Sequence, residues 1–347
     1  MIVSHSKPSI DREDVDMVTK ALSSGQISSG EIVKRFEDRI ARFVGVKHGI
    51  TASSGTSAIH LALVGLGVGL GDEVIIPSYV CTSPYMAVRH AGATPIVADV
   101  GARDFNLCAD SVKMRTSPRT KAIILPHMFG APAELDEILE LGIPVVEDCA
   151  QSLGAEYKKR RVGSFGAASV CSFYATKMIT TGEGGVVMTN DDEIYNKIAD
   201  LRQYDKKPLN VVRYNYKMSD LQAALGLAQL KKLNSFVRRR RKIASIYDER
   251  FSRCPLDLFR ERPLTKCAYY RYVVFTDELD RVKKKSRKRG VICEKPVFKP
   301  LHLILHSDEC PNCDSIYDRA LSIPIYPSLT DDEIDYVADT IEDATKR

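Results

Sequence analysis

The sequence predicts an α/β protein with a mostly parallel central sheet that is covered by helices on both faces. Short apolar runs of the length of buried strands recur along the chain, at residues 73–77, 93–100, 121–126, 143–146, 167–174 and 186–188. Segments with apolar residues at helical spacing separate several of these runs. Strands that alternate with helices form parallel sheets whose two faces are both buried.

A change of pattern near Tyr269 predicts a second, smaller domain. The run Y-Y-R-Y-V-V-F at residues 269–275 has strand character, and a strongly charged helical segment follows it. This combination is typical of an α+β domain. We therefore expect a large domain over residues 1–232 and a small C-terminal α+β domain over residues 233–347.

The composition is that of a soluble globular protein. The 347 residues are 44% hydrophobic and 27% charged, and a formal net charge of +5 does not by itself indicate a nucleic-acid partner. Residues 1–8 lack the apolar core of a signal peptide, and no apolar stretch reaches membrane-spanning length. Nine scattered cysteines fit a reducing cytoplasm, and the lone pair Cys310 and Cys313 lacks a second ligand pair, so we expect no metal site.

The N-terminal region predicts helices over residues 11–23 and 33–43, followed by a strand and a glycine turn. The stretch S-S-G-T-S at residues 53–57 precedes an apolar helix. Helix N-termini bind phosphate because their N–H groups are unpaired and the helix dipole is positive there. Gly55 allows close approach of the backbone, and Thr56 and Ser57 add hydroxyl groups. The alternative interpretation is a simple helix cap.

The stretch from Glu147 to Gly185 carries the candidate chemistry. The apolar run 143–146 stops at Glu147 and Asp148, and Gln151 follows. A strand that ends in a carboxylate places negative charge at the carboxyl edge of the sheet, where open α/β sheets bind ligands. The next apolar run carries Ser172.

Lys177 follows this second run, among glycines and hydroxyl residues. Pyridoxal phosphate needs a lysine for its aldehyde, an acid at its ring nitrogen and donors for its phosphate. Lys177, Asp148 and Ser172 are residues of these types. Each alone is also typical of a surface lysine, a helix-capping aspartate or a strand serine.

Four motifs of this stretch occur together in one known family. They are E-D-C-A-Q at 147–151, G-S-F-G at 163–166, S-F-Y-A-T-K at 172–177 and G-E-G-G at 182–185. In this combination the chain resembles the DegT/DnrJ/EryC1/StrS aminotransferases, which are nucleotide-sugar aminotransferases of fold type I. Related motifs extend the resemblance from about residue 20 to the C-terminus.

The resemblance implies a pyridoxal phosphate site and a reaction. Lys177 is implied to hold the cofactor and to carry a proton, and Asp148 to keep the ring nitrogen protonated. Gln151 is implied to contact the ring near its 3′-oxygen, and Thr56 and Ser57 to hold the phosphate. The implied amino donor is L-glutamate, and the implied acceptor is a keto-sugar carried on a nucleotide diphosphate.

Two further positions follow from the family pattern. Cys81 stands where most members carry an aromatic residue that stacks on the cofactor ring, so Tyr79 and Tyr85 become candidates for ring contact. A core position for Tyr79 is the alternative. The Asn of the Y-N-Y motif crosses the dimer interface to the partner's cofactor phosphate in the family, and Asn215 matches it. The resemblance therefore implies a homodimer with a shared active site, and a helix follows over residues 219–230.

Other polar features have two interpretations each. The basic runs at 236–242 and 282–289 are either solvated helix faces or surfaces that attract a nucleotide diphosphate. His127 follows an apolar run, so it is either a pocket residue or a loop histidine bonded to backbone. RNA binding has no recognition motif to support it.

Three other functions fit parts of the pattern. A sugar deoxygenase or dehydratase of the same fold characteristically carries histidine in place of Lys177. A cofactor-binding regulator without turnover is at odds with the intact Lys177, Asp148 and Gln151. A general amino-acid aminotransferase needs an arginine for the substrate carboxylate, and the sequence assigns none.

Overall fold

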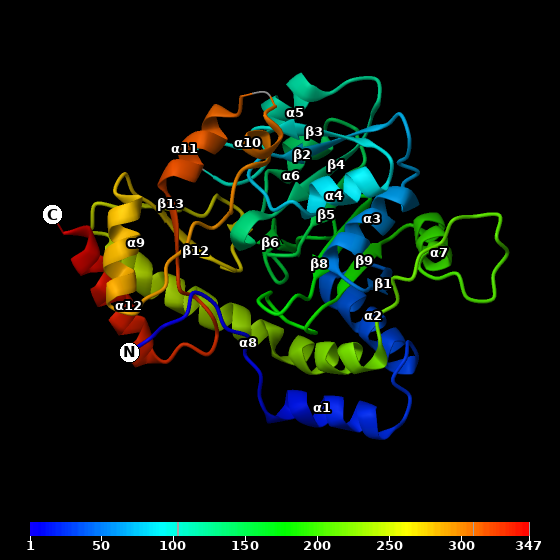
Figure 1. Ribbon diagram of the computed structural model, residues 1–347, viewed down its shortest axis with the longest axis horizontal. Helices are drawn as coiled ribbons and strands as arrows, with labels where there is room; N and C mark the ends of the chain where they lie inside the picture. The colour runs from blue at the N-terminus through cyan, green and yellow to red at the C-terminus, as the bar shows by residue number, and fades with distance from the viewer. Residues whose placement is uncertain (103, 308, 347) are drawn as a thin grey trace.

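The computed structural model describes residues 1–102, 104–307 and 309–346, and a seven-stranded sheet forms its centre (Figure 1). The strand order is β1-β9-β8-β5-β4-β2-β3. Neighbours from β8 to β3 pair in parallel, whereas β9 is antiparallel to both β8 and β1. The strands are β1 (His48–Ala52), β2 (Glu73–Pro77), β3 (Thr94–Ala98), β4 (Thr120–Pro126), β5 (Val145–Asp148), β8 (Ala168–Ser172) and β9 (Gly185–Thr189). The predicted mostly parallel sheet is confirmed.

Helices cover both faces of this sheet because alternate strand residues point to opposite sides. Val74 and Ile76 join one apolar cluster, and Ile75 between them joins the other. The first cluster packs against α3 (Gly55–Gly65), α4 (Ser83–His90) and α7 (Asp192–Leu201). The second packs against α2 (Glu31–Val44), α5 (Ala109–Arg115), α6 (Leu135–Leu139) and the first half of α8.

Helix α8 (Asp220–Phe251) joins the sheet region to the C-terminal region and is much longer than the predicted helix over 219–230. It begins with the predicted capping box, in which Ser219 and Gln222 exchange hydrogen bonds. Buried residues continue along one side of it, from Leu233 and Val237 to Phe251. Helix α8 and its buried side thus continue without a break past residue 232, where the sequence predicts a domain boundary. The boundary itself stays a prediction.

The C-terminal region has its own apolar cluster and a small antiparallel sheet. The strands are β10 (Asp257–Leu258), β12 (Tyr272–Phe275) and β13 (Ala320–Ile323), and the helices are α9 (Leu279–Lys288), α10 (Leu301–Leu305), α11 (Pro311–Arg319) and α12 (Asp331–Thr345). The remaining elements are α1 (Arg12–Ser23), the short helix η1 (Met128–Gly130) and the strands β6 (Glu156–Tyr157), β7 (Arg160–Arg161) and β11 (Thr265–Lys266). Across the described residues, every helix is too short or too polar to span a lipid bilayer.

The basic run at 236–242 mainly attaches α8 to the C-terminal segments. Arg240 is buried, and its Nη1 donates hydrogen bonds to the carbonyl oxygens of Tyr269, Tyr270 and Ile325 at 3.2, 3.1 and 2.7 Å. Its neighbour Arg241 donates to the carbonyl oxygen of Cys267 at 2.8 Å. These two side chains therefore belong neither to a solvated helix face nor to a ligand-binding surface, the two interpretations that the sequence allowed.

Replacing Arg240 with methionine tests this attachment. The change keeps most of the buried volume but leaves carbonyl oxygens without donors, and each such group costs about 1–3 kcal/mol. We expect a lower melting temperature and a lower denaturant midpoint. The exposed neighbour Arg238 is the matched control, because Arg238→Met changes the same charge without a buried contact. Equal midpoints for the two variants would contradict the assigned role.

Candidate functional site

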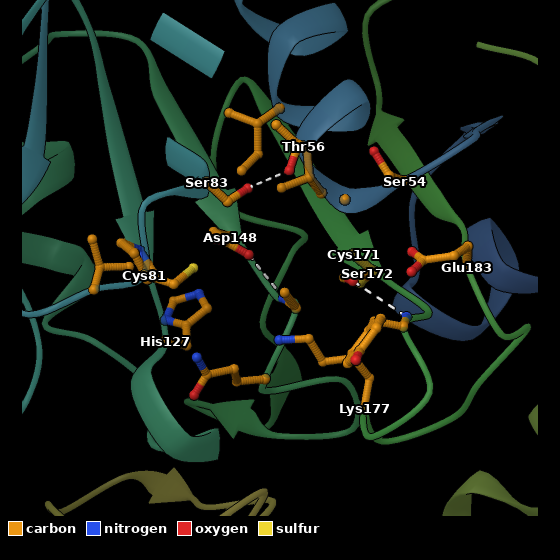
Figure 2. Close-up of a pocket in the computed structure, with 18 residues that line it drawn as sticks. Ser54, Thr56, Cys81, Ser83, His127, Asp148, Cys171, Ser172, Lys177 and Glu183 are labelled. Carbon is orange, nitrogen blue, oxygen red and sulfur yellow. Dashed lines mark hydrogen bonds between the residues drawn. The ribbon is translucent and has the colours of Figure 1, made fainter. Parts of the chain in front are cut away.

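A cavity of about 220 Å³ lies at the carboxyl ends of the central strands (Figure 2). It is formed where β5 and β8 end, where the chain leaves β2, and where α3 begins. This is the edge at which open α/β sheets bind ligands. Six of the residues predicted for the site line the cavity together: Thr56, Cys81, Asp148, Gln151, Ser172 and Lys177.

The carboxylate of Glu147 lies next to the cavity-lining Asp148 and holds the 163–166 turn and His127 in place. It is fully buried, and Oε1 accepts hydrogen bonds from the amides of Phe165 and Gly166, each at 2.7 Å. Oε2 accepts from the amide of Gly163 at 2.7 Å and pairs with Nε2 of His127 at 3.0 Å. The E-D and G-S-F-G motifs therefore meet through one side chain, a link that sequence reasoning missed.

His127 lines the cavity, as one of its two interpretations predicts. The amide of Ala133 donates to its Nδ1 at 3.0 Å, so this nitrogen carries no proton and Nε2 donates to Glu147. His127, Glu147 and Cys149 offer ligand atoms within 4.8 Å of one another. Both oxygens of Glu147 are already occupied by N–H donors, so this cluster has no oxygen left for a metal ion.

Asp148 ends β5 with its carboxylate facing the cavity. One oxygen, Oδ1, accepts the amide of Ala150 at 2.9 Å, and no described residue donates a hydrogen bond to the other. Burial raises the pKa of Asp148, whereas the Ala150 amide and the positive charge of Lys177 lower it. A buried carboxylate is costly unless a cation or a hydrogen-bond donor compensates it. The other oxygen, Oδ2, is therefore free to accept a hydrogen bond from a cationic donor.

Lys177 enters the cavity from the loop after β8 (Figure 2). Its backbone amide donates to the carbonyl of Tyr174 at 2.9 Å, which turns the chain back toward the sheet. Its Nζ lies 5.2 Å from the centre of the Tyr270 ring and forms no ion pair with the described residues. The amine therefore lies near an aromatic face and shares the cavity with Asp148, but it is not within ion-pair distance of any described carboxylate.

Gln151 presents an amide to the cavity. Its Oε1 accepts the backbone N–H of Phe129 at 2.9 Å, which fixes the orientation of the side chain. The NH₂ group has no partner among the described residues. Two N–H donors are therefore available beside Asp148.

The N-terminus of α3 forms a second polar side of the cavity. Thr56 Oγ1 and Ser83 Oγ lie 2.7 Å apart, and both residues line the cavity. Ser172 faces Gly55 so closely that a Cβ on Gly55 would lie 2.8 Å from the Ser172 Cβ. Glycine is needed for this approach, which brings a helix N-terminus and hydroxyls together. Sequence reasoning missed Ser83, although Ser-Pro at a helix start is a usable signal.

Three predicted residues do not line the cavity. The Ser57 hydroxyl closes a capping box with Ser54, which is the cap alternative. Tyr79 is fully buried against Phe105 and Phe129, the core alternative, while Cys81 two residues later reaches the cavity. Asn215 is exposed, in the segment before α8.

Comparison with known proteins gives a family and close relatives. The model of the DegT/DnrJ/EryC1/StrS aminotransferase family matches residues 8–342. The chain is 33% identical to GDP-perosamine synthase of Escherichia coli O157:H7, over 97% of each protein. It is 31% identical to UDP-N-acetyl-3-dehydro-alpha-D-glucosamine 3-aminotransferase of Acidithiobacillus ferrooxidans, over 93% of this chain and 91% of the relative.

The similar solved structures are aminotransferases too. An aminotransferase, TlmJ, from Streptoalloteichus hindustanus is 29% identical with a TM-score of 0.93, and the match covers 99% of this chain and 98% of that one. A putative sugar aminotransferase from Streptococcus pneumoniae in its PLP-form has a TM-score of 0.94 at 25% identity, covering 99% of both chains. The fold predicted from the sequence, that of the fold type I transferases, is confirmed.

Replacing Glu147 with glutamine tests the hydrogen bonds that its carboxylate accepts from the 163–166 turn and His127. An NH₂ group would face backbone N–H donors, and we expect a loss of about 3–5 kcal/mol in unfolding free energy. Burial alone would raise the pKa of Glu147, but the His127 and amide hydrogen bonds lower it. The carboxylate therefore stabilises the fold above its unfolded pKa of about 4.3, and this contribution fades as pH falls through the lower native pKa.

Urea titrations of the wild type and of Glu147→Gln between pH 3 and 7 measure the contribution of the carboxylate to the unfolding free energy. The difference between wild type and Glu147→Gln should be largest near neutral pH and should shrink at acid pH. Glu140→Gln, at an exposed position, is the control and should leave the curve unchanged. A difference that grows at low pH would contradict the assignment.

Replacing Gly55 with alanine tests the approach of α3 to Ser172. The new methyl group would collide with the Ser172 Cβ and move the helix N-terminus. We expect the dissociation constant for pyridoxal phosphate to rise at least about tenfold, measured by absorbance titration of the apoprotein. Gly69→Ala is the control, because nothing lies within 4 Å of a Cβ there. Unchanged affinity in Gly55→Ala would refute the phosphate role of this corner.

Proposed function

Since the chain belongs to the DegT/DnrJ/EryC1/StrS aminotransferase family and is a pyridoxal-phosphate-dependent aminotransferase, we propose that it transfers an amino group from L-glutamate to a nucleotide-linked keto-sugar. The product is an amino sugar for polysaccharide or secondary-metabolite synthesis. The names of the two curated relatives support a nucleotide-linked sugar as the acceptor.

The residues of the cavity fit pyridoxal phosphate. Asp148 has an open oxygen for a protonated ring nitrogen, and the NH₂ group of Gln151 suits the ring oxygen. The N-terminus of α3, with Thr56 and Ser172, suits the phosphate. The space between Gly55 and Ser172 is so narrow that a single added methyl group on Gly55 would disturb the proposed phosphate site.

The observation that carries the proposal is the Lys177 amine in the same cavity as the Asp148 carboxylate. When bound, pyridoxal phosphate supplies an aldehyde that takes up the amino group and a ring that accepts the electron pair of the donor's α-carbon. Lys177 would hold the aldehyde through Nζ, and its freed Nζ would carry the proton that moves between the reacting carbons. General acid–base help of this kind contributes about 10²- to 10⁴-fold in rate.

Asp148 sets the electronic state of the site. Its carboxylate would accept a hydrogen bond from the ring nitrogen and favour the protonated ring, because an opposite charge within about 4–6 Å moves a pKa by about one to three units. A positive ring nitrogen beside Asp148 would in turn favour the charged carboxylate and oppose the effect of burial, which raises the pKa of Asp148.

We further propose that the enzyme is a homodimer with shared active sites. Tyr214 and Tyr216 stack at 5.0 Å against the same side of the chain, where His60 meets the Tyr214 ring at 4.8 Å. Asn215 lies between these two tyrosines in the chain and is exposed. An exposed Asn215 suits contact with a partner's cofactor phosphate. A cytoplasmic location stays a prediction from the cysteine content.

The other functions from the sequence have less support. Lys177 enters the cavity, whereas a deoxygenase of this fold characteristically has histidine there. A regulator without turnover has no need of an unpaired amine opposite an open carboxylate. No described feature favours either function over the aminotransferase.

A panel of UDP-, dTDP- and GDP-linked 4-keto-sugars with L-glutamate tests the proposal through release of 2-oxoglutarate. Lys177→Ala should reduce turnover by at least about 10³-fold, and Asp148→Asn by about 10²-fold, because the first removes the covalent anchor and the second only the ring counter-charge. The control Lys20→Ala, at an exposed lysine of α1, should match wild type. Normal turnover in Lys177→Ala, or no reaction with any acceptor, would refute the proposal.

A further inference from the structure

The buried side chain of Tyr270 packs against Lys177, although it does not line the cofactor cavity. Nζ of Lys177 lies 5.2 Å from the centre of the Tyr270 ring, a distance at which an aromatic face attracts an ammonium group. The phenol oxygen lies 3.4 Å from Oγ1 of Thr176, the residue before Lys177. Tyr270 therefore contacts the lysine segment at two points, the amine and the neighbouring hydroxyl.

The backbone of Tyr270 lies against the turn that follows β4. Gly130 has a φ of +92° to +95° excluded to side chains in this packing, because a Cβ there would lie 2.7 Å from the amide nitrogen of Tyr269 and 3.0 Å from that of Tyr270. The same turn is held at Phe129, whose amide donates to Oε1 of Gln151. A residue of the cofactor cavity and the Tyr270 segment thus share one support.

The backbone of Tyr269 directs two neighbouring tyrosines into different parts of the protein. Its φ of 50° lies in the left-handed region, which is uncommon for a bulky residue. Tyr269 joins the apolar cluster of the C-terminal region, whereas Tyr270 joins a cluster of the central sheet. Nη1 of Arg240 donates to the carbonyl oxygens of both tyrosines and so holds this conformation. Backbone conformations of this kind cluster at functional sites.

A second cation lies near the same ring. The guanidinium carbon of Arg271 is 5.0 Å from the centre of the Tyr270 ring. Its Nη1 donates to the imidazole of His5 at 2.9 Å, and this imidazole is neutral because burial and the charge of Arg271 lower its pKa to about 3. Burial alone would raise the pKa of Tyr270, but the positive charges of Lys177 and Arg271 lower it. The charge of Lys177 therefore acts on the Tyr270 side chain.

The ring of Tyr270 is the contact that the structure gives to the Lys177 amine. No described residue accepts a hydrogen bond from Nζ or forms an ion pair with it. A lysine side chain has four flexible bonds, so an amine without a partner has many positions open to it. The aromatic face restricts these positions.

We propose that Tyr270 is a positioning residue whose ring holds Nζ of Lys177 in place while this nitrogen carries the proton in amino-group transfer. The proposal rests on the proposed function. The neutral amine takes a proton from the α-carbon of the donor, becomes an ammonium, and gives this proton to the carbon that came from the aldehyde. An aromatic face attracts the ammonium, so the contact acts when Nζ is released from the aldehyde and carries the proton.

Replacing Tyr270 with leucine or phenylalanine separates the ring from the hydroxyl. In a single turnover of the holoenzyme with L-glutamate, Tyr270→Leu should slow 2-oxoglutarate release about tenfold, as expected for the loss of a shielded cation–π contact. Tyr270→Phe keeps the ring and should stay within about threefold of wild type. In both variants borohydride should still attach pyridoxal phosphate to Lys177. The control is Tyr336→Leu, because the Tyr336 ring also faces a cation, Arg289, at 5.7 Å.

Fluorinated phenylalanines at position 270 make the test independent of packing. Each added fluorine weakens the attraction of the ring face for a cation and changes the shape of the ring little. The single-turnover rate should therefore fall stepwise from phenylalanine to trifluorophenylalanine. A tyrosine with a merely structural role would give equal rates across this series.

Acylation of Lys177 in the apoprotein needs neither cofactor, donor nor acceptor. Loss of the ring in Tyr270→Leu should speed acylation of Lys177 at neutral pH at least about threefold, because the ammonium form is no longer stabilised by the ring. Peptide mass spectrometry measures this, with the exposed Lys20 of α1 as an internal reference that should not change.

A flat fluorine series, or acylation of Lys177 in Tyr270→Leu at the wild-type rate, would overturn the role of Tyr270 and leave the proposed function standing. Acylation that responds to the ring, in a protein that aminates no nucleotide-linked sugar, would instead refute the proposed function and leave the contact between Tyr270 and Lys177 in place.

Discussion

The buried carboxylate of Glu147 is the interaction on which the rest of the site depends. Four N–H donors converge on it, three from the 163–166 turn and one from His127. Removing a carboxylate from water costs several kcal/mol, and a hydrogen bond to a charged group returns about 1.5–3 kcal/mol. Four such bonds together offset the cost of burial, and each bond that is lost makes the buried carboxylate less favourable. The interaction therefore depends on the turn, the strand and the histidine together.

The position of the proposed catalytic groups follows from this constraint. Glu147 and Asp148 are neighbours on β5, so their side chains point to opposite sides of the sheet. When Glu147 is held by the turn on one side, Asp148 is directed into the cavity on the other, with one oxygen fixed by Ala150. Lys177 reaches the same cavity from the loop after β8, the strand that pairs with β5. The two groups are brought together by strand pairing.

Much of this arrangement follows from sequence patterns, because the relevant signals are local. Apolar runs identify the strands, and polar residues where the runs stop identify the edge that binds a ligand. This reasoning places Asp148, Ser172 and Lys177 together. It predicts that the strand containing the apolar run 143–146 ends in a carboxylate, and β5 (Val145–Asp148) ends at Asp148, since the buried hydrogen bonds of Glu147 let two carboxylates continue the strand.

Features that depend on contacts between residues far apart in the chain cannot be predicted from local sequence patterns. Nothing in the local sequence shows that Tyr79 fills the core while Cys81 lines the cavity. Both residues follow the end of β2, where side chains no longer alternate regularly between the two faces of a sheet. Arg240 looks like its neighbours in a basic run, yet its three carbonyl partners lie 29, 30 and 85 residues away.

The most direct measurement is the mapping of the covalent attachment of the cofactor. The protein is loaded with pyridoxal phosphate, reduced with borohydride and digested, and the modified lysine is identified by mass spectrometry. Our account predicts one modified residue, Lys177, and much lower occupancy in the Asp148→Asn variant when loading is done at limiting cofactor. Attachment at another lysine, or a protein that carries the cofactor with Lys177 unmodified, would contradict it.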